Sequence, residues 1–404
     1  MSTKYAAGII TAVNPVTPSG PYQTSTASGI WTMEQAGYWI KQGQWPTAGA
    51  TASLWSWGRN NNGQLGLGNI TDYSSPKQVG SLNNWVSTVG FMRSNSAYAI
   101  KSNGTLWSWG NNGVGELGLG NTTYYSSPKQ VGSLTTWLNI AASYLDALAT
   151  KTDGTLWSWG YNNYGQLGLG NITRYSSPKQ VGSLTNWLSV SCGSYSMFAT
   201  KTDGTLWSWG LNNYGQLGLG NVTKYSSPKQ VGSLTNWAGA SIAASGGTSL
   251  VIKSDGTFWA WGTYNAGQLP LNVIAVYSSP KQVGVLTNWL TVTAGLYHAG
   301  AVKSNGTAWV WGQGTNGALG LNNSTSYSSP VQLGALTTWS KLSAGRFHTA
   351  ATKTDKSLWS WGSNVYGQLG LGSTTNYSSP KQVGSLNVWA TVSSGNYHTI
   401  ATTQ

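Results

Sequence analysis

The sequence predicts an all-β fold: a seven-bladed β-propeller preceded by a short, mostly extended amino-terminal arm that contains one short helix. Three observations predict it. A unit of about fifty residues recurs seven times, the two ends of the repeat region complete one another, and the composition suits short strands and tight turns. Of the 404 residues, 54 are Gly, 24 are Trp and 21 are Tyr, whereas only 7% are charged. Disordered chains have the opposite composition, so we expect a folded core.

Three landmarks define the repeat. A Tyr-Ser-Ser-Pro string lies 19 residues after the start of each Leu-Trp-Ser-Trp-Gly string, and a further Trp follows 12 residues after the Tyr. The Leu-Trp-Ser-Trp-Gly string or a close variant begins at Leu54, Leu106, Leu156, Leu206, Phe258, Ala308 and Leu358. Because these landmarks account for 21 of the 24 Trp residues, we expect most Trp side chains to be structural.

Each repeat combines strand and turn signals. In Leu-Trp-Ser-Trp the two Trp side chains fall on one side of a strand and Leu and Ser on the other, so stacked sheets could bury both sides. An Asn-Gly or Asp-Gly pair precedes this strand in five junctions and predicts a tight hairpin. The sixth junction has Asp355-Lys356, so we expect strain or another turn there. The Pro of Tyr-Ser-Ser-Pro predicts an edge strand.

The ends of the repeat region predict a closed ring. The chain enters the repeat at the strand 53–57 and stops at 398–402, the strand that precedes it elsewhere. Ring closure would place these two segments side by side. No repeat has a helical period, which excludes a helical solenoid and leaves an open β-solenoid as the structural alternative.

Residues 1–50 lack the repeat and form the predicted docking arm, while residues 51–404 form the propeller. Thr32 and Gln35 fit a capping box for a short helix that ends near Gln42. Trp31, Trp39 and Trp45 give this small segment a large apolar surface, so we expect the arm to dock onto another surface.

The sequence offers no catalytic, cofactor or metal motif. Four of the eight acidic residues occupy hairpin turns, and the others, Glu34, Asp72, Glu116 and Asp146, fall in different units. The three His residues recur one unit apart, and we expect hydrogen-bonding roles at strand starts. Cys192 is the only cysteine, so no intrachain disulfide can form. No apolar run is long enough for a membrane helix, and we expect no secretory signal at the start.

Two variable patches predict a ligand-binding face. One is the loop before the strand that ends in Lys, and the other follows Trp-Gly. The first and fourth units are two residues longer than the others, and we expect both insertions in the first of these loops. Hairpin geometry places both patches at the end of the blade opposite the Asp-Gly turn, where variable loops on a rigid scaffold suit recognition. The predicted face comprises Arg59, Asn62, Arg93, Asn111, Tyr161, Tyr164, Tyr195, Leu211, Tyr214, Tyr297, Arg346, Phe347, Tyr366 and Tyr397.

Two lysine series account for most of the formal net charge of +13. One precedes the hairpin turns (Lys101, Lys151, Lys201, Lys253, Lys303 and Lys353), and the other follows Tyr-Ser-Ser-Pro (Lys77, Lys129, Lys179, Lys229, Lys281 and Lys381). A symmetric ring of lysines without arginine forks predicts a diffuse anion-attracting or solvated surface rather than the reading of nucleic-acid bases.

The repeat W-x-x-V-S-x-G-x-x-H-T-x-A-x-x-x-D-G-x-L-W-S-W-G-x-N-x-x-G-Q-L-G-L-G resembles that of the regulator of chromosome condensation family over residues 51–404. The resemblance implies a seven-bladed propeller with the closure described above. It does not imply one function, because the family includes a nucleotide exchange factor for a small GTPase, a plant ultraviolet-B photoreceptor and a β-lactamase inhibitor protein. The photoreceptor carries its Trp cluster in the Gly-x-x-His motif, where this chain has Tyr297, Phe347 and Tyr397.

The segment Ser-Gly-Ile-Trp-Thr and the later Trp-Pro resemble a motif of tailed-bacteriophage structural proteins, often tail fibres. This resemblance suggests a non-enzymatic virion protein whose arm binds other virion proteins and whose loops bind a host-surface glycan or protein, with no membrane insertion and with several copies on the particle. The alternatives are a cytoplasmic regulatory or scaffold propeller that binds a protein or chromatin partner, and a hydrolase of surface polymer.

Overall fold

The computed structural model describes residues 52–90, 94–237, 241–263, 267–271 and 275–404. Within these residues, strands form seven antiparallel four-stranded sheets, each a blade of the predicted propeller. The predicted arm, with its helix and with Trp31, Trp39 and Trp45, lies outside the described residues. The all-β seven-bladed fold is confirmed.

We number the blades in chain order, and six of them consist of four consecutive strands. The first strands are β3 (Trp85–Gly90), β7 (Trp137–Ala142), β11 (Trp187–Cys192), β15 (Ser241–Ser245), β19 (Trp289–Ala294), β23 (Trp339–Ala344) and β27 (Trp389–Ser394). The second strands are β4 (Ser96–Lys101), β8 (Asp146–Lys151), β12 (Ser196–Lys201), β16 (Thr248–Ile252), β20 (His298–Lys303), β24 (His348–Lys353) and β28 (His398–Thr403).

The third strands carry the double-Trp string, and the fourth carry Tyr-Ser-Ser-Pro. The third strands are β5 (Leu106–Gly110), β9 (Leu156–Gly160), β13 (Leu206–Gly210), β17 (Phe258–Gly262), β21 (Ala308–Gly312), β25 (Leu358–Gly362) and, for blade 7, β1 (Leu54–Gly58). The fourth are β6 (Tyr125–Gln130), β10 (Tyr175–Gln180), β14 (Tyr225–Gln230), β18 (Tyr277–Gln282), β22 (Tyr327–Gln332), β26 (Tyr377–Gln382) and, for blade 7, β2 (Tyr73–Gln78). A short 3-10 helix, η1 (Thr315–Gly317), lies between β21 and β22.

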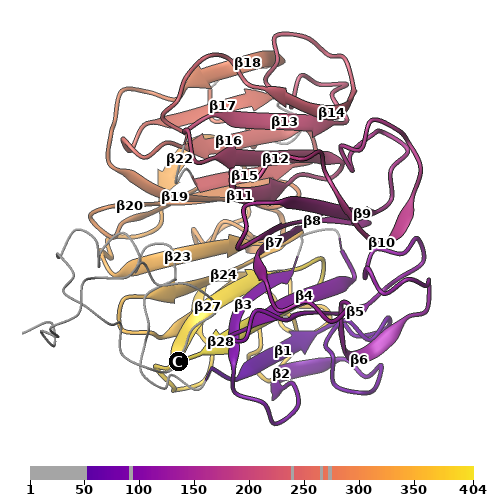
Figure 1. Cartoon of the computed structure of the whole chain (residues 1–404). Coiled ribbons are helices and arrows are strands. Elements are labelled where there is room, and N and C mark those ends of the chain that lie inside the picture. Colours follow the sequence, from indigo (N-terminus) through magenta and orange to yellow (C-terminus); the bar gives the residue numbers. More distant parts are fainter. Residues whose placement is uncertain (1–51, 91–93, 238–240, 264–266, 272–274) are drawn as a thin grey trace, which may run out of the picture.

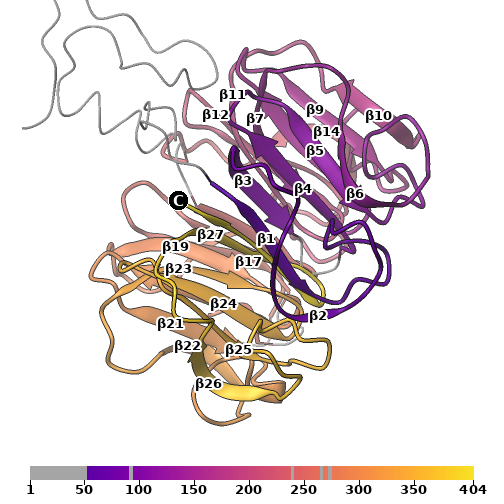
Figure 2. The ribbon, with the colours of Figure 1, turned by 90° about the horizontal axis from the view of Figure 1, so that it is seen from below.

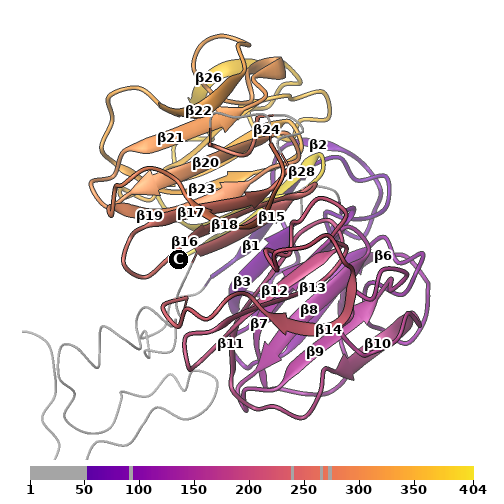
Figure 3. The ribbon, with the colours of Figure 1, turned by 90° about the horizontal axis from the view of Figure 1, so that it is seen from above.

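Each blade runs from a first strand near the ring centre to a fourth strand at its rim. The first strands contact those of neighbouring blades, and small side chains of β11, β15, β19, β23 and β27 line a shared central space. Figure 2 shows β3 to β6 side by side in one sheet, and Figure 3 shows β19 to β22 in the same order. The Tyr-Ser-Ser-Pro strands are edge strands, as the Pro predicts.

Blade 7 closes the ring by joining the two ends of the repeat region. Strand β1 pairs antiparallel with β28, with Leu54 opposite Thr402 and Gly58 opposite His398. Figure 1 shows the indigo β1 beside the yellow β28. The predicted pairing of 53–57 with 398–402 is therefore confirmed.

The second Trp of each double-Trp strand joins its blade to the preceding one. Trp109 is fully buried, and its indole N–H donates to the Gln64 carbonyl at 2.9 Å. The ring lies against Gly66, where an added Cβ would sit 2.8 Å from the indole nitrogen. Equivalent indole bonds occur in all seven blades, from Trp57, Trp109, Trp159, Trp209, Trp261, Trp311 and Trp361. Large rings thus meet small residues between stacked sheets, as predicted.

The sixth hairpin keeps the common turn at the cost of backbone strain. Lys356 has φ 63°, in the left-handed region that Gly occupies at the other junctions, and its N–H donates to the Lys353 carbonyl. The Asp355 carboxylate accepts from the Ser357 N–H and hydroxyl, as Asp153 does with Thr155. Of the two predicted outcomes, strain is the one observed.

The prediction for the two longer units is half right. In blade 1, the loop closed by the Gly90–Ala97 pair is two residues longer than the loop closed by the equivalent Cys192–Met197 pair of blade 3, so the insertion lies in the predicted loop. In blade 4 that loop keeps its length, and the extra residues lie between Trp237 and Ser241, at the entrance to β15. Sequence spacing could not distinguish the two positions of the insertion, because both fall between the same two landmarks, the Trp and the Lys.

Candidate functional site: the loop face

One end of the propeller gathers the variable loops. These loops join first to second strands and third to fourth strands, and we call this end the loop face. In every blade the residue after Trp-Gly donates its N–H to a carbonyl in the first of these loops: Arg59 to Tyr397 at 2.9 Å, and Tyr161 to Leu145 at 2.9 Å. The two variable patches therefore lie together as predicted, while ligand binding by them stays a prediction.

An arc of aromatic and arginine side chains crosses the loop face over blades 5, 6 and 7. Tyr297 stacks on Phe347 with ring centres 5.1 Å apart and planes 23° apart. Arg346 lies over both Phe347 and Tyr397, at 5.3 and 5.4 Å from the ring centres. Tyr397 meets Tyr366 edge-on at 5.0 Å.

Arg59 completes this arc from the loop after β1. Its guanidinium lies 4.8 Å from the centre of the Tyr366 ring and 5.7 Å from that of Tyr397. Six predicted residues thus form one continuous group, which we call the aromatic arc: Tyr297, Phe347, Arg346, Tyr397, Tyr366 and Arg59. All six are half-buried, so their edges remain accessible while their packing limits their rotamers.

A second group, the tyrosine cluster, lies over blades 2 and 3. Tyr195 contacts Tyr161 and Tyr164 with ring centres 5.8 and 5.1 Å apart, and Tyr144 meets Tyr195 at 6.1 Å. Two cations cover this cluster: Arg174 lies 4.6 Å from the Tyr161 ring centre, and Lys224 lies 5.1 Å from that of Tyr164.

The sequence prediction missed Tyr144, Arg174 and Lys224. The last two occupy the position just before Tyr-Ser-Ser-Pro, which also differs in every repeat, with Asp72 and Tyr124 as other examples. Comparing the repeats at this position would have identified it as a third variable patch.

Four other predicted residues do not join either group. Asn111 donates to Glu116, and the N–H of Asn62 donates to the side chain of Gln64, so both stabilise their own loops. Leu211 and Tyr214 lie on the same face, where Tyr214 is 42% exposed and approaches Gly247. Arg93 lies outside the described residues.

Two buried carboxyl groups lie beneath the loop face in neighbouring blades. Asp146 is 1% exposed, accepts from Gln166 at 3.3 Å, and has one carboxyl oxygen without a partner in the described structure. Burial raises its pKa from 3.8 to about 8, and burial likewise raises the pKa of Glu116. Glu116 adds to the rise at Asp146, so folding does bring two distant acidic residues within electrostatic reach. We therefore expect Asp146 to be mostly protonated at neutral pH.

Two of the three His residues, His298 and His348, join neighbouring blades through Thr hydroxyls. Thr349 donates its hydroxyl to the Ala318 carbonyl, so the contact of 2.8 Å between this hydroxyl and His298 requires the His Nε2 to donate. His348 contacts Thr399 in the same way at 3.1 Å. Burial lowers the pKa of His298 and His398 to about 4 and that of His348 to about 3. The predicted hydrogen-bonding role is therefore confirmed for His298 and His348, each with its partner on the next blade. Both ring nitrogens of His398 are buried without a hydrogen-bond partner among the described residues.

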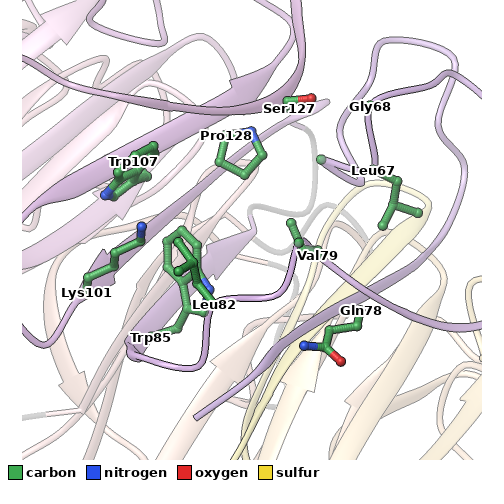
Figure 4. Close-up of a pocket in the computed structure, with 12 residues that line it drawn as sticks. Leu67, Gly68, Gln78, Val79, Leu82, Trp85, Lys101, Trp107, Ser127 and Pro128 are labelled. Atoms are coloured by element: carbon green, nitrogen blue, oxygen red, sulfur yellow. The ribbon is translucent and has the colours of Figure 1, made fainter. Parts of the chain in front are cut away.

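The lysines before the turns do not form the diffuse surface that the sequence predicts. Each ammonium group lies between two Trp rings, 3.5–4.0 Å from the centre of the third-strand ring and 4.3–4.9 Å from that of the Trp that begins the first strand or, in blade 4, precedes it. Figure 4 shows Lys101 beside Trp85 and Trp107 in one such cage. Lys101 is only 5% exposed, and burial lowers its pKa.

The prediction failed because it treated each lysine as a surface charge. Two Trp residues at fixed spacing from it offered a more favourable partner than bulk anions. The second lysine series lies over Tyr rings at 5.4–5.8 Å.

Two features are absent from the described parts of the chain. No three His, Cys, Asp or Glu side chains are placed there to hold a metal ion. No helix there is both long and apolar enough to cross a membrane.

Comparison with known proteins gives the family and the fold. The model of the RCC1-like domain matches residues 40–340, and models of the regulator of chromosome condensation (RCC1) repeat match residues 339–368 and 355–402. Protein RCC2 homolog of Xenopus laevis is 43% identical over 79 residues, which cover 19% of this chain and 15% of that protein. The match therefore spans only a small part of this relative.

Two solved structures share the architecture. Human WBSCR16 superposes with a TM-score of 0.77 at 21% identity, over 87% of this chain and 99% of that chain. Yeast RCC1 (Prp20), solved with bound Kap60, gives a TM-score of 0.77 at 19% identity, over 87% and 89% of the two chains. The chain belongs to the family of RCC1-like domains.

Proposed function

We propose that this protein is a non-enzymatic regulatory or scaffold propeller, and that its loop face binds the acidic surface of a partner protein. One observation carries the proposal: the aromatic arc, in which four aromatic rings and two arginines from five loops form a continuous group on a rigid ring. Tyr and Arg are the residues that most often dominate binding energy at protein interfaces.

The packing of the arc supports recognition rather than loop stability alone. Arg59 and Arg346 are held in place by rings, so less side-chain entropy is lost when a partner binds. An arginine that stacks through its plane keeps N–H groups at its edge, and these can bind carboxylates in a bidentate manner. No ion pair involves these arginines among the described residues, which leaves their charge for a partner.

The charge balance of the loop face favours an acidic partner. Arg59, Arg174, Lys224 and Arg346 all lie there over aromatic rings. The carboxyl groups of Asp146 and Glu116 lie beneath the face, and burial favours their neutral forms. Exposed Asp72 offsets only part of this positive charge.

The relatives agree with a protein partner. Yeast RCC1 was solved with the protein Kap60, and it shares this fold at 19% identity. The virion hypothesis rests on residues 1–50, outside the described residues, so attachment to virion proteins, binding of a host-surface glycan and a virion location all stay predictions. We carry forward the protein-binding proposal.

Photo-crosslinking tests this proposal directly. A photoreactive amino acid replaces Phe347 in the aromatic arc, and a matched probe replaces Thr202, an exposed residue of a turn at the opposite end. We expect adducts with a discrete protein from the native cell extract only from position 347. Mass spectrometry should place the adducts near Asp- and Glu-rich segments, and Arg59→Ala with Arg346→Ala should reduce the yield at least tenfold. Equal yields from both positions, or glycan adducts alone, would overturn the proposal.

A further inference from the structure

Six blades share one cation cage at the end opposite the loop face. In each, the lysine at the end of the second strand lies between the third-strand Trp and a Trp at the start of the first strand, except that in blade 4 Trp237 precedes β15 and Lys253 follows β16. The two rings meet edge-on with centres 6.0–6.3 Å apart. The indole N–H of the third-strand Trp donates to a turn hydroxyl, as Trp107 does to Thr105 at 2.9 Å. The cage therefore has two rings, an internal ammonium guest and an anchored indole.

Blade 7 keeps the two rings, but no described residue places an ammonium group between them. Trp55 and Trp389 meet edge-on at 6.2 Å and 73°, within the range of the other blades. Residue 403, which pairs with Trp389 as Lys201 pairs with Trp187, is Thr. The Thr403 hydroxyl accepts from the Ser53 N–H at 3.1 Å, so this side chain is turned to closing the ring.

The same blade also lacks the turn hydroxyl that anchors the indole. Ring closure joins β1 and β28 from opposite ends of the chain, so no hairpin turn links them. The Trp55 indole nitrogen is buried and has no hydrogen-bond partner among the described residues, unlike the third-strand Trp of the other blades.

The cage of blade 7 opens into a pocket that is slightly larger than the matching pockets of blades 1 and 2. It is lined by Trp55, Trp389, Thr403, Pro76 and residues of the β25–β26 and β26–β27 connections, and has a volume of about 370 Å³. The matching pockets of blades 1 and 2 have volumes of about 330 and 300 Å³.

We infer that the Trp55–Trp389 cage of blade 7 is a binding site for a primary alkylammonium group, such as the end of a lysine side chain that comes from outside the blade. The six complete cages show which chemistry these rings select, because each holds a lysine ammonium within 4.0 Å of a Trp ring centre. The faces of Trp rings carry negative potential that attracts a cation more strongly when water is excluded.

The pocket suits the four-carbon stem of a lysine side chain in addition to its charged end. In five of the six complete cages the lysine side chain is almost fully buried, with Lys201 at 5% exposure, and Lys353 in the sixth is half-buried. A ligand that enters blade 7 from solvent would replace both the stem and the ammonium. A neutral molecule of the same length would replace only the stem, so the two contributions can be separated.

The test uses n-butylammonium as the probe and n-butanol as its neutral match, with the full chain at low salt. Ring currents of the two Trp rings should shift the probe's methylene NMR signals upfield. We expect saturable binding of n-butylammonium that is on the order of tenfold tighter than that of n-butanol.

Two matched variants assign the site. Thr403→Lys restores the lysine of the other blades and should abolish the shift by filling the cage. Lys101→Thr empties the cage of blade 1 and should add a second equivalent of binding. Trp55→Leu should also abolish the native shift, and near-ultraviolet circular dichroism checks that each variant is folded.

Variants of the arm distinguish the sources of the guest. If binding appears only after Lys4→Ala or Lys41→Ala, the guest is a lysine of this chain, which supports the inference. If the wild-type chain binds the probe directly, the guest is external, which also supports it. An unchanged shift in Thr403→Lys, or no binding in wild type and arm variants while Lys101→Thr gains a site, would overturn it.

Discussion

Replacing Asp146 with Asn should stabilise the protein at neutral pH. The folded state holds this carboxyl group in a buried position that raises its pKa from 3.8 to about 8, so the folded protein keeps the proton while the unfolded chain releases it. Because the folded pKa is raised, this residue costs nothing below pH 3.8, and stability is lost as pH rises from about 4 to about 8. At about 1.4 kcal/mol per pH unit, the loss reaches about 4 kcal/mol at pH 7.

Urea unfolding of wild type and Asp146→Asn, followed by Trp fluorescence at pH 5, 6, 7 and 8, measures this loss. The variant keeps the shape of the protonated carboxyl group but cannot ionise. We therefore expect its stability advantage to grow by about 1.4 kcal/mol per pH unit and to level off near pH 8. Asp146→Ser is a second test, since Ser occupies the equivalent positions 96 and 196.

Asp153→Asn is the matched control. Hydrogen bonds from Thr155 to this turn carboxylate outweigh its slight burial and lower its pKa below 3.8. Its stabilising contribution is therefore complete above pH 4, so this variant should be less stable than wild type by the same amount from pH 5 to 8. If the gap between wild type and Asp146→Asn is equally flat over this range, Asp146 ionises freely and the reasoning fails.

Three further predictions concern stability. Lys356→Gly should stabilise the protein by about 0.5–1 kcal/mol, because Gly tolerates the φ of 63° at this turn. Thermal melts should show this gain, whereas the reverse change Gly306→Lys should destabilise the protein, because its Cβ would lie 2.0 Å from the Thr337 carbonyl oxygen. In urea unfolding, Lys201→Met should lower the free energy of unfolding by about 1–2 kcal/mol, because it removes the cation between Trp187 and Trp207. Lys77 lies over one ring at 5.5 Å, so Lys77→Met should lower it by less than about 0.5 kcal/mol, and equal losses would contradict the cage. Between pH 4 and 6, the free energy of unfolding should depend less steeply on pH in His398→Asn, by the equivalent of about one proton. The reason is that the folded pKa of about 4 makes the unfolded state bind this proton first; an unchanged slope would show that His398 titrates normally.

The fold could be predicted from the sequence because the same strand and turn signals recur from unit to unit. The double-Trp string and the edge Pro recur in all seven units, and an Asn-Gly or Asp-Gly turn occurs in five of the six junctions, so one misread unit does not change the predicted fold. Closure could also be predicted, since the unit is cut between β28 and β1. Where two landmarks bracket both a strand entrance and a loop, as at 237–253, spacing alone could not place the insertion.

For the candidate site, the sequence could predict which face of the propeller carries it, but not which side chains contact one another there. Repeat-to-repeat variation identifies loop positions such as Tyr366 and Tyr397, and strand pairing brings them to one end. It does not show that Arg59 stacks on Tyr366 across the closure, because that contact joins residues 307 positions apart and depends on side-chain rotamers. Lysine placement failed for the same reason, since partners in three dimensions decide whether a charge is solvated or caged.

Ring closure has a chemical consequence as well as a structural one. A repeat cut between its second and third strands must leave one blade without a hairpin turn, and the residues at that junction are then free to serve another purpose. Here the Thr403 hydroxyl accepts from the Ser53 N–H across the junction, and among the described residues blade 7 has neither the lysine nor the turn hydroxyl that completes the other six cages. Because both losses fall on Trp55, blade 7 is distinguished from six near-identical neighbours at its closure. A protein built from equivalent units can acquire a unique site in this way without any unusual motif, and the Thr403→Lys and Lys101→Thr pair asks whether this one binds a cation.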